Sequence, residues 1–276
     1  MSETGVVHLV WRPAGTEPLK RFIESYGAYS AGMEHDLTVV FNGFSGSDAA
    51  EHRELLADIP HRELQLDNSV LDIAAYFWAA RQLNCRYVCF LNSYSTPLVT
   101  GWLSMLHAHA ADPGVGAAGA TGSWESFYSS YLRHRDADSR GRLSRLLRSP
   151  YHRWKTIRYL ANFSPAPNPH LRSNAFMLER SRFLSFQPRR LKTKWDTWVF
   201  ESGRRGMTAQ LLAQGLRVVI VGRDGHGYGP EEWRESATYR LAEQRNLLIG
   251  DNRTRDYDEA GAEERALLSA LAWEVG

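Results

Sequence analysis

The stretch RYVCFLNSYSTP, residues 86–97, joins a run of apolar side chains to a group of short polar ones. Its first part, residues 86–91, is almost continuously apolar, which is typical of a strand buried on both faces. Its second part contains turn-forming amide and hydroxyl residues, which end the strand. These residues are Asn92, Ser93, Tyr94 and Ser95. The stretch therefore predicts a buried strand followed at once by four polar side chains.

Three similar units precede this strand. Strands are expected at residues 6–10, 36–41 and 61–66, and helices at 17–28, 51–59 and about 70–82. Asp67, Asn68 and Ser69 form the expected N-cap cluster of the third helix. Alternating strands and helices predict an α/β fold: a mostly parallel central sheet with helices on both faces. We expect one domain over residues 1–276 with a variable second half.

Polar residues follow several of these strands. In open parallel sheets, ligands bind beyond the carboxyl ends of the strands. Besides residues 92–95, these ends carry Trp11, Arg12, Asn42, Asp67 and Asn68. The sequence thus predicts a binding site at this edge of the sheet.

Composition excludes several classes of protein. The 276 residues include 33 Lys and Arg against 31 Asp and Glu, so the formal charge of +2 provides no global field for nucleic acid. A hydrophobic content of 43% is enough for a sizeable core. Cys85 and Cys89 form neither a disulfide framework nor a zinc site, which favours a reducing cytoplasm. Without a signal peptide or a long apolar run, the protein is expected to be soluble or peripheral to a membrane.

The second half contains two unusual segments. Residues 113–122 are a glycine-rich strand without a phosphate-loop pattern. Residues 132–160 carry nine basic and two acidic residues, a local charge of +7. We expect an inserted basic amphipathic lid, with Leu143, Leu146 and Leu147 on one helical face and Arg142, Arg145 and Arg148 on another. We expect this lid to dock on an anionic acceptor carrier or on the inner face of a membrane. The alternative is a solvated helix face that pairs with acidic residues elsewhere in the protein.

The order of these strands, the block at residues 87–97, and the later Gly101-Trp-Leu and Gly114-Val-Gly-Ala-Ala-Gly segments resemble family 2 glycosyltransferases of the GT-A fold over about residues 6–225. The resemblance implies a nucleotide-sugar-binding half at about 1–122 and an acceptor-side half at 123–276. The donor would be a UDP-, GDP- or dTDP-sugar. The implied reaction is an inverting transfer to a glycan, lipid-linked or other glycoconjugate acceptor in bacterial-type polysaccharide assembly.

The family's metal motif is altered here. Its fourth strand usually ends in an Asp-x-Asp-like motif that holds a divalent cation against the donor diphosphate. Asn92 and Tyr94 occupy the two carboxylate positions, and neutral oxygens are poor sole ligands for such a cation. The metal requirement stays open, with Asp224 and His226 as the remaining candidate ligands.

The resemblance also implies donor contacts. It places Asn42 against the nucleotide base and Asp67, Asn68 and Asp72 in the donor pocket, while Trp11 could stack on the base and Arg12 could pair with phosphate. The alternative interpretation is structural. Asn42 then only forms a turn, and Asp67 and Asn68 only cap a helix.

An inverting transferase needs a carboxylate base that takes the proton of the acceptor hydroxyl. The resemblance places it near residues 194–203, where Glu201 and Asp196 are candidates. We favour Glu201, because Asp196 occupies a position where aspartate often caps a helix; structural salt bridges are the alternative for both. His170, Arg172 and Asn174 resemble the acceptor side, or they satisfy buried backbone groups.

Two other functions remain open. Loss of both motif carboxylates favours a catalytically inactive GT-A-like protein that binds a nucleotide sugar or glycan. A nucleotidyltransferase would need a glycine-rich, basic first loop, and residues 11–15 are a poor version of one.

Overall fold

The computed structural model describes residues 2–46, 48–137, 142–188 and 190–273; for residues 136, 137 and 142–149 it describes the backbone only. The strands are β1 (Thr4–Trp11), β2 (Asp36–Asn42), β3 (Arg62–Leu66), β4 (Tyr87–Leu91), β5 (Thr96–Pro97), β6 (Val115–Gly119), β7 (Gly122–Ser123), β8 (His170–Leu171), β9 (Ala175–Glu179), β10 (Arg217–Val221), β11 (Gly227–Tyr228) and β12 (Ile249–Gly250). The helices are α1 (Glu17–Ala28), α2 (Ala50–Leu55), α3 (Asp72–Gln82), α4 (Trp102–Ala110), α5 (Phe127–Ala137), α6 (Arg142–Asn162), α7 (Arg180–Ser185), α8 (Lys194–Ser202), α9 (Met207–Ala213), α10 (Asn252–Glu259) and α11 (Ala262–Ala272).

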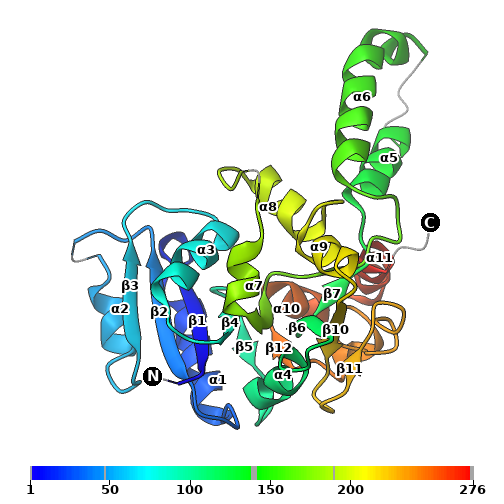
Figure 1. Cartoon of the computed structure of the whole chain (residues 1–276). Coiled ribbons are helices and arrows are strands. Elements are labelled where there is room, and N and C mark those ends of the chain that lie inside the picture. Colours follow the sequence, from blue (N-terminus) through cyan, green and yellow to red (C-terminus); the bar gives the residue numbers. More distant parts are fainter. Residues whose placement is uncertain (1, 47, 138–141, 189, 274–276) are drawn as a thin grey trace.

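Eight strands form the central sheet in the order β11-β10-β6-β9-β4-β1-β2-β3 (Figure 1). Strand β9 pairs antiparallel with β4 and β6, and β11 pairs antiparallel with β10, while the other paired strands run parallel. The expected fold class, α/β with a mostly parallel sheet, is confirmed. The antiparallel β9 is important for the site, because its amino end lies beside the carboxyl ends of its neighbours.

Helices cover both faces of the sheet. Alternate residues of β1 belong to separate cores: Val6 and Val10 pack with α1 and α4, whereas Val7 and Leu9 pack with α3, α7, α8 and α9. This alternation follows from the two-residue period of a strand. His8 belongs to the first face, where it stacks on Phe22 with ring centroids 3.7 Å apart, and burial lowers its pKa to about 3. His8 is therefore a neutral core residue.

The expected N-cap cluster of α3 is wrong. The helix begins at Asp72 after Leu71, and no side chain caps it. Residues 67–71 instead form a connection without regular secondary structure, with bends at Asp67 and Asn68, and other elements hold it in place. The Asn42 side-chain amide donates to the Val70 carbonyl oxygen and accepts from the Val70 N–H. The Trp11 indole donates a hydrogen bond to Ser69. Short polar residues before an apolar run look like a cap whether or not the backbone turns there.

The basic segment predicted at residues 132–160 falls on α5 and α6. Figure 1 shows these two helices side by side and projecting away from the sheet. The side chains of Leu143, Leu146, Leu147 and of Arg142, Arg145, Arg148 lie outside those that the structure describes, so the expected faces stay a prediction. No helix within the described ranges is long and apolar enough to cross a membrane.

Candidate functional site

The site lies where the strand order reverses, between β1 and β4, which is where open α/β sheets bind ligands. Trp11 is the last residue of β1 and forms hydrogen bonds with the segments that follow β4 and β3. Its backbone N–H donates to Ser93 Oγ at 3.2 Å, and its indole Nε1 donates to Ser69 Oγ at 3.0 Å. Trp11 therefore ties together three of the segments that were expected to contact a donor.

Residues 92–95 form a closed turn after β4. Asn92 Oδ1 accepts from the Tyr94 N–H at 2.9 Å, and Ser95 Oγ lies 2.9 Å from the same oxygen. Ser95 Oγ also lies 2.7 Å from the Asn174 carbonyl oxygen, and both Ser93 and Ser95 are buried. Many of the hydrogen-bonding groups of this turn are thus already paired within the turn or with Asn174. Its role in donor binding stays a prediction.

The remaining donor-side candidates differ in exposure. Asn42 is fully buried, and its amide pairs with Val70, which supports a structural role. Asp67 and Asn68 are exposed on the loop before α3. Arg12 forms an exposed ion pair with Asp48 at 3.1 Å. These residues lie on the same side of the site as Trp11.

Two short pairings bring the second half of the chain to this edge. Strand β8 pairs with β7, and β12 pairs with β5 directly after the residue 92–95 turn. The first pairing places Arg172 and Asn174 beside the carboxyl end of β6, where Thr121 Oγ1 donates to Asn174 Oδ1 at 2.6 Å. The second places α10 beside β4. Neither long-range pairing has a local sequence signal.

Arg172 and Asp251 form a buried ion pair at the base of the site. Arg172 Nη2 lies 2.7 Å from Asp251 Oδ2, and the side chains are 13% and 1% exposed. Burial alone would lower the pKa of Arg172, but the Asp251 charge raises it overall; the same pair lowers the pKa of Asp251. The guanidinium also donates to Thr121 and lies 4.2 Å from the Tyr239 ring centroid. Arg172 therefore positions other groups and is not free to bind substrate as an isolated cation.

Two carboxylates lie near this pair, and the charge of Glu201 acts on both Asp72 and Arg172. Glu201, in the last turn of α8, accepts a 2.6 Å hydrogen bond from the Ser173 N–H through Oε1. Asp72 begins α3, and burial raises its pKa to about 6, with a further contribution from the charge of Glu201. Asp72 therefore keeps its proton to a higher pH than an exposed aspartate. A carboxylate fixed by a backbone hydrogen bond is suited to accept a proton, and one with a pKa of about 6 exchanges its proton close to neutral pH.

Arginine residues provide positive charge near the same edge. Arg255 of α10 is partly buried and donates to the Tyr94 carbonyl oxygen at 3.3 and 3.4 Å. Burial lowers the pKa of Arg255, and the charge of Arg21, near the start of α1, lowers it further. Two cations that repel each other favour an anion between or beside them. The turn at Tyr94 thus lies next to two arginines, and the charge of Arg255 is partly offset by Asp251, Asp256 and Glu259.

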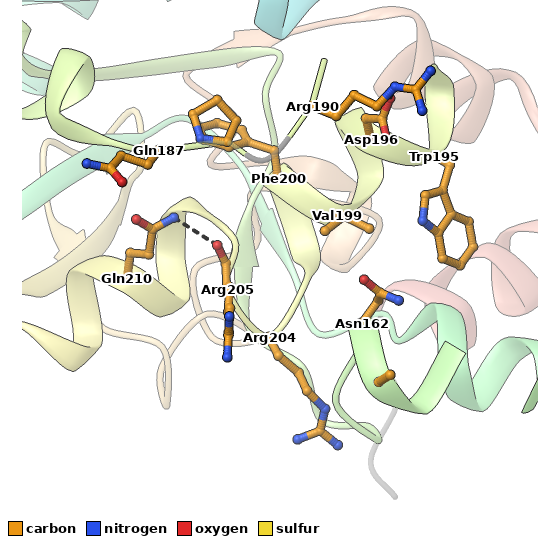
Figure 2. A pocket seen from close by; sticks show the side chains of 12 residues that line it. Asn162, Gln187, Arg190, Trp195, Asp196, Val199, Phe200, Arg204, Arg205 and Gln210 are labelled. Carbon is orange, nitrogen blue, oxygen red and sulfur yellow. Dashed lines mark hydrogen bonds and ion pairs between the residues drawn. The ribbon is translucent and has the colours of Figure 1, made fainter. Parts of the chain in front are cut away.

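Asp196 lies elsewhere. It occupies the N3 position of α8 and forms a capping box with Thr193. It also lines a cavity of about 590 Å³ formed by the end of α6, the segment before α8, and α8 and α9 (Figure 2). Arg190, Arg204 and Arg205 line the same cavity, and Glu201 does not. The two catalytic candidates are therefore separated.

The other predicted residues do not join the carboxylates. His170 is buried, with Nδ1 2.8 Å from the Asn168 carbonyl oxygen. Asp224 accepts from the Tyr228 hydroxyl, the Asn246 amide and the His226 backbone N–H. In the part of the chain that the structure describes, no group of three His, Cys, Asp or Glu residues is placed to hold a metal. The assignment of Asp224 and His226 as metal ligands therefore stays a prediction.

Sequence reasoning missed Asp251, Arg255 and Ser173. Asp251 is the N-cap of α10 and forms a capping box with Thr254, so a cap pattern at residues 251–254 was available as a signal. Nothing local links it to Arg172, which lies 79 residues earlier. Ser173 contributes only a backbone N–H, which no side-chain pattern can indicate.

No family model and no curated protein matches the chain. Among solved structures, the mannosyltransferase PcManGT from Pyrobaculum calidifontis, in complex with GDP-Man and Mn2+, is similar over 65% of this chain and 45% of its own, with 11% identity and a TM-score of 0.41. S. aureus TarS 1-349 in complex with UDP-GlcNAc is similar over 42% of this chain and 33% of its own, with 13% identity and a TM-score of 0.34. The match spans less than half of either of those chains.

Replacing Asp251 with Asn tests the ion pair. Asn can still cap α10, so the change removes the charge and leaves Arg172 buried without its partner. We expect the free energy of unfolding to fall by about 3 to 5 kcal/mol. Asp196→Asn is the matched control, because Asp196 also belongs to a helix capping box but, among the described residues, its ion pair is with the exposed Arg190. The loss of stability for Asp196→Asn should be at most about 1 kcal/mol. Equal losses in denaturant titrations would contradict the account.

Asp72 predicts a pH-dependent stability. Its folded pKa of about 6 exceeds the ordinary aspartate value of 3.8, so the folded state binds more protons than the unfolded state between these values. Its contribution to stability therefore falls as pH rises from about 4 to about 6. Asp72→Asn should be more stable than the wild type at about pH 7.5, by at most about 3 kcal/mol, and this difference should disappear near pH 4. A stability difference between Asp72→Asn and the wild type that stays constant with pH would contradict the raised pKa.

Proposed function

We propose that the protein is a nucleotide-sugar-dependent glycosyltransferase that inverts the anomeric centre, with a glycan or other glycoconjugate as acceptor. The observation that carries this proposal is the position of Glu201. Its carboxylate is fixed by Ser173 and lies with Asp72 beside the carboxyl ends of the parallel strands, where such sheets bind ligands.

Glu201 acts as the general base in this proposal. It accepts the acceptor hydroxyl proton while that oxygen attacks the anomeric carbon of the donor, and the bond from that carbon to the diphosphate oxygen breaks. The nucleoside diphosphate leaves with the bonding electrons. The hydrogen bond from Ser173 restricts the orientation of the carboxylate, so little reorganisation is needed at the moment of transfer.

The leaving diphosphate gains negative charge, and the site must stabilise that charge. Arg255 is suited to this role. It is held against the Tyr94 carbonyl at the turn after β4, and its repulsion by Arg21 is relieved when a phosphate binds. Bidentate contact between a guanidinium and phosphate would also fix the orientation of the donor. In this proposal Arg255 of α10 contacts the diphosphate, a role that the altered motif at Asn92 and Tyr94 does not fill.

Trp11 completes the donor side. It is partly exposed at the end of β1; its backbone N–H bonds the turn after β4, and its indole is held by Ser69 of the loop before α3. A fixed aromatic plane at the strand ends is suited to stacking on a nucleotide base. The exposed Asp67 and Asn68 lie on the adjoining loop, within the same proposed donor pocket.

Glu201→Gln tests the proposal. Gln keeps the shape and can still accept the Ser173 N–H, but it cannot take a proton. Turnover, followed as release of nucleoside diphosphate from UDP-, GDP- and dTDP-sugars with acceptor, should fall by about a hundredfold to ten-thousandfold. Donor affinity should barely change, because the lost interaction belongs to the transition state.

Asp196→Asn is the control for this experiment, because Asp196 caps α8 and faces the separate cavity. It should leave turnover nearly unchanged. Near-normal turnover in Glu201→Gln would overturn the assignment of the base. Donor binding without turnover in the wild-type protein would favour the alternative function, a catalytically inactive nucleotide-sugar-binding protein.

A further inference from the structure

Helix α6 carries an unusual concentration of exposed apolar side chains. The described part of the chain contains seven large hydrophobic residues with exposed side chains, and four of them lie on α6. They are Tyr151, Trp154, Ile157 and Leu160, which are 55%, 54%, 66% and 39% exposed. At 3.6 residues per turn, this spacing spreads the four residues over about half of the helix surface, with Trp154 and Ile157 at its centre. An exposed apolar strip of this kind is typical of a surface that binds a protein or a membrane.

The other side of α6 is already occupied by α5. Tyr131 of α5 stacks on Tyr159, with ring centroids 4.7 Å apart, and its hydroxyl lies 3.2 Å from His152 Nδ1. Residues 152 and 159 are nearly two turns apart and define the packed side. Trp154 and Ile157 point away from it. Figure 1 shows the α5–α6 pair projecting from the sheet, so the exposed side is accessible.

The charge of α6 has one sign. Its sequence contains six basic residues and no Asp or Glu. Among the described side chains, Lys155 Nζ lies 4.7 Å from the Tyr151 ring centroid, and the Arg158 guanidinium lies 5.4 Å from that of Trp154. The charged ends of Lys155 and Arg158 therefore lie over aromatic rings of the exposed strip. Arg158 and Arg153 are exposed and Lys155 is half-buried, so positive charge borders the apolar side chains at the surface.

Positive charge continues at the carboxyl end of the helix. Ala161 and Asn162 line the cavity of about 590 Å³ that also contains Arg190, Arg204 and Arg205 (Figure 2). Arg158 connects the two regions, because its guanidinium lies 4.0 Å from the ring centroid of Trp195, which lines the cavity. The exposed strip therefore adjoins a basic surface at its carboxyl end.

We propose that the exposed face of α6 docks on a lipid bilayer that contains anionic phospholipid. Trp154 and Ile157 enter the boundary between head groups and acyl chains, and Arg153, Lys155 and Arg158 bind lipid phosphates. An apolar strip of aromatic and aliphatic residues, flanked only by Lys and Arg, is the pattern of a helix that lies in the membrane interface. The charge complementarity is with an anionic surface, since α6 has no acid to bind cationic groups.

Cosedimentation of the full chain with vesicles tests this. The vesicles are phosphatidylcholine alone, or phosphatidylcholine with about one-third phosphatidylglycerol. We expect binding to the anionic vesicles only, weakened by salt. Arg153→Gln and Arg158→Gln should each weaken binding about fivefold. Ile157→Glu should weaken it at least about tenfold, whereas Ile157→Trp should bind at least as well as the wild type.

Leu267→Glu is the matched control, because Leu267 is 60% exposed and belongs to a different helix, α11. It should leave vesicle binding unchanged, and thermal unfolding should be similar for all these variants, whose changed side chains are exposed. No binding to anionic vesicles at low salt would overturn the proposal. So would equal binding to pure phosphatidylcholine, or binding that Ile157→Glu leaves intact. Specific capture of an acidic protein in the absence of lipid binding would assign the face to a protein partner instead.

Discussion

The candidate site depends on the buried ion pair between Arg172 and Asp251. A buried guanidinium without a counter-charge would strongly destabilise the fold, so the pairing fixes the amino end of α10 against the segment that leads into β9. The next residue along, Ser173, then presents its N–H to Glu201. One turn into α10, Arg255 reaches the carbonyl of Tyr94. The proposed base and the proposed phosphate contact are both positioned by elements that this ion pair joins.

Much of the sheet could be predicted because its strands have a strong local signal. The apolar runs at β1, β2 and β4 are nearly continuous, as burial on both faces requires, and they form parallel strands where expected. The antiparallel direction of β9 could not be predicted. Its sequence, Ala175–Glu179, is as apolar as a parallel strand, and its direction depends on the long connection through α5 and α6.

The site was predictable only in part, for a similar physical reason. Glu201 and Asp72 were both among the predicted residues, and they lie close enough for the charge of Glu201 to raise the pKa of Asp72. The amide side chains of Asn42 and Asn92 were chosen for their position at strand ends, yet much of their hydrogen-bonding capacity serves the backbone nearby. Arg255 was missed because its approach to Tyr94 depends on the pairing of β12 with β5, between segments about 150 residues apart in the chain.

Calorimetric titration with UDP and GDP, in chelator and after addition of Mg2+ or Mn2+, tests most directly whether the strand edge is the nucleotide site. The account predicts saturable binding to the wild-type chain that Arg255→Gln weakens at least about tenfold. Arg205→Gln, in the arginine-lined cavity, should leave that affinity unchanged. Binding that Arg205→Gln abolishes and Arg255→Gln preserves would place the nucleotide in the cavity and contradict the account.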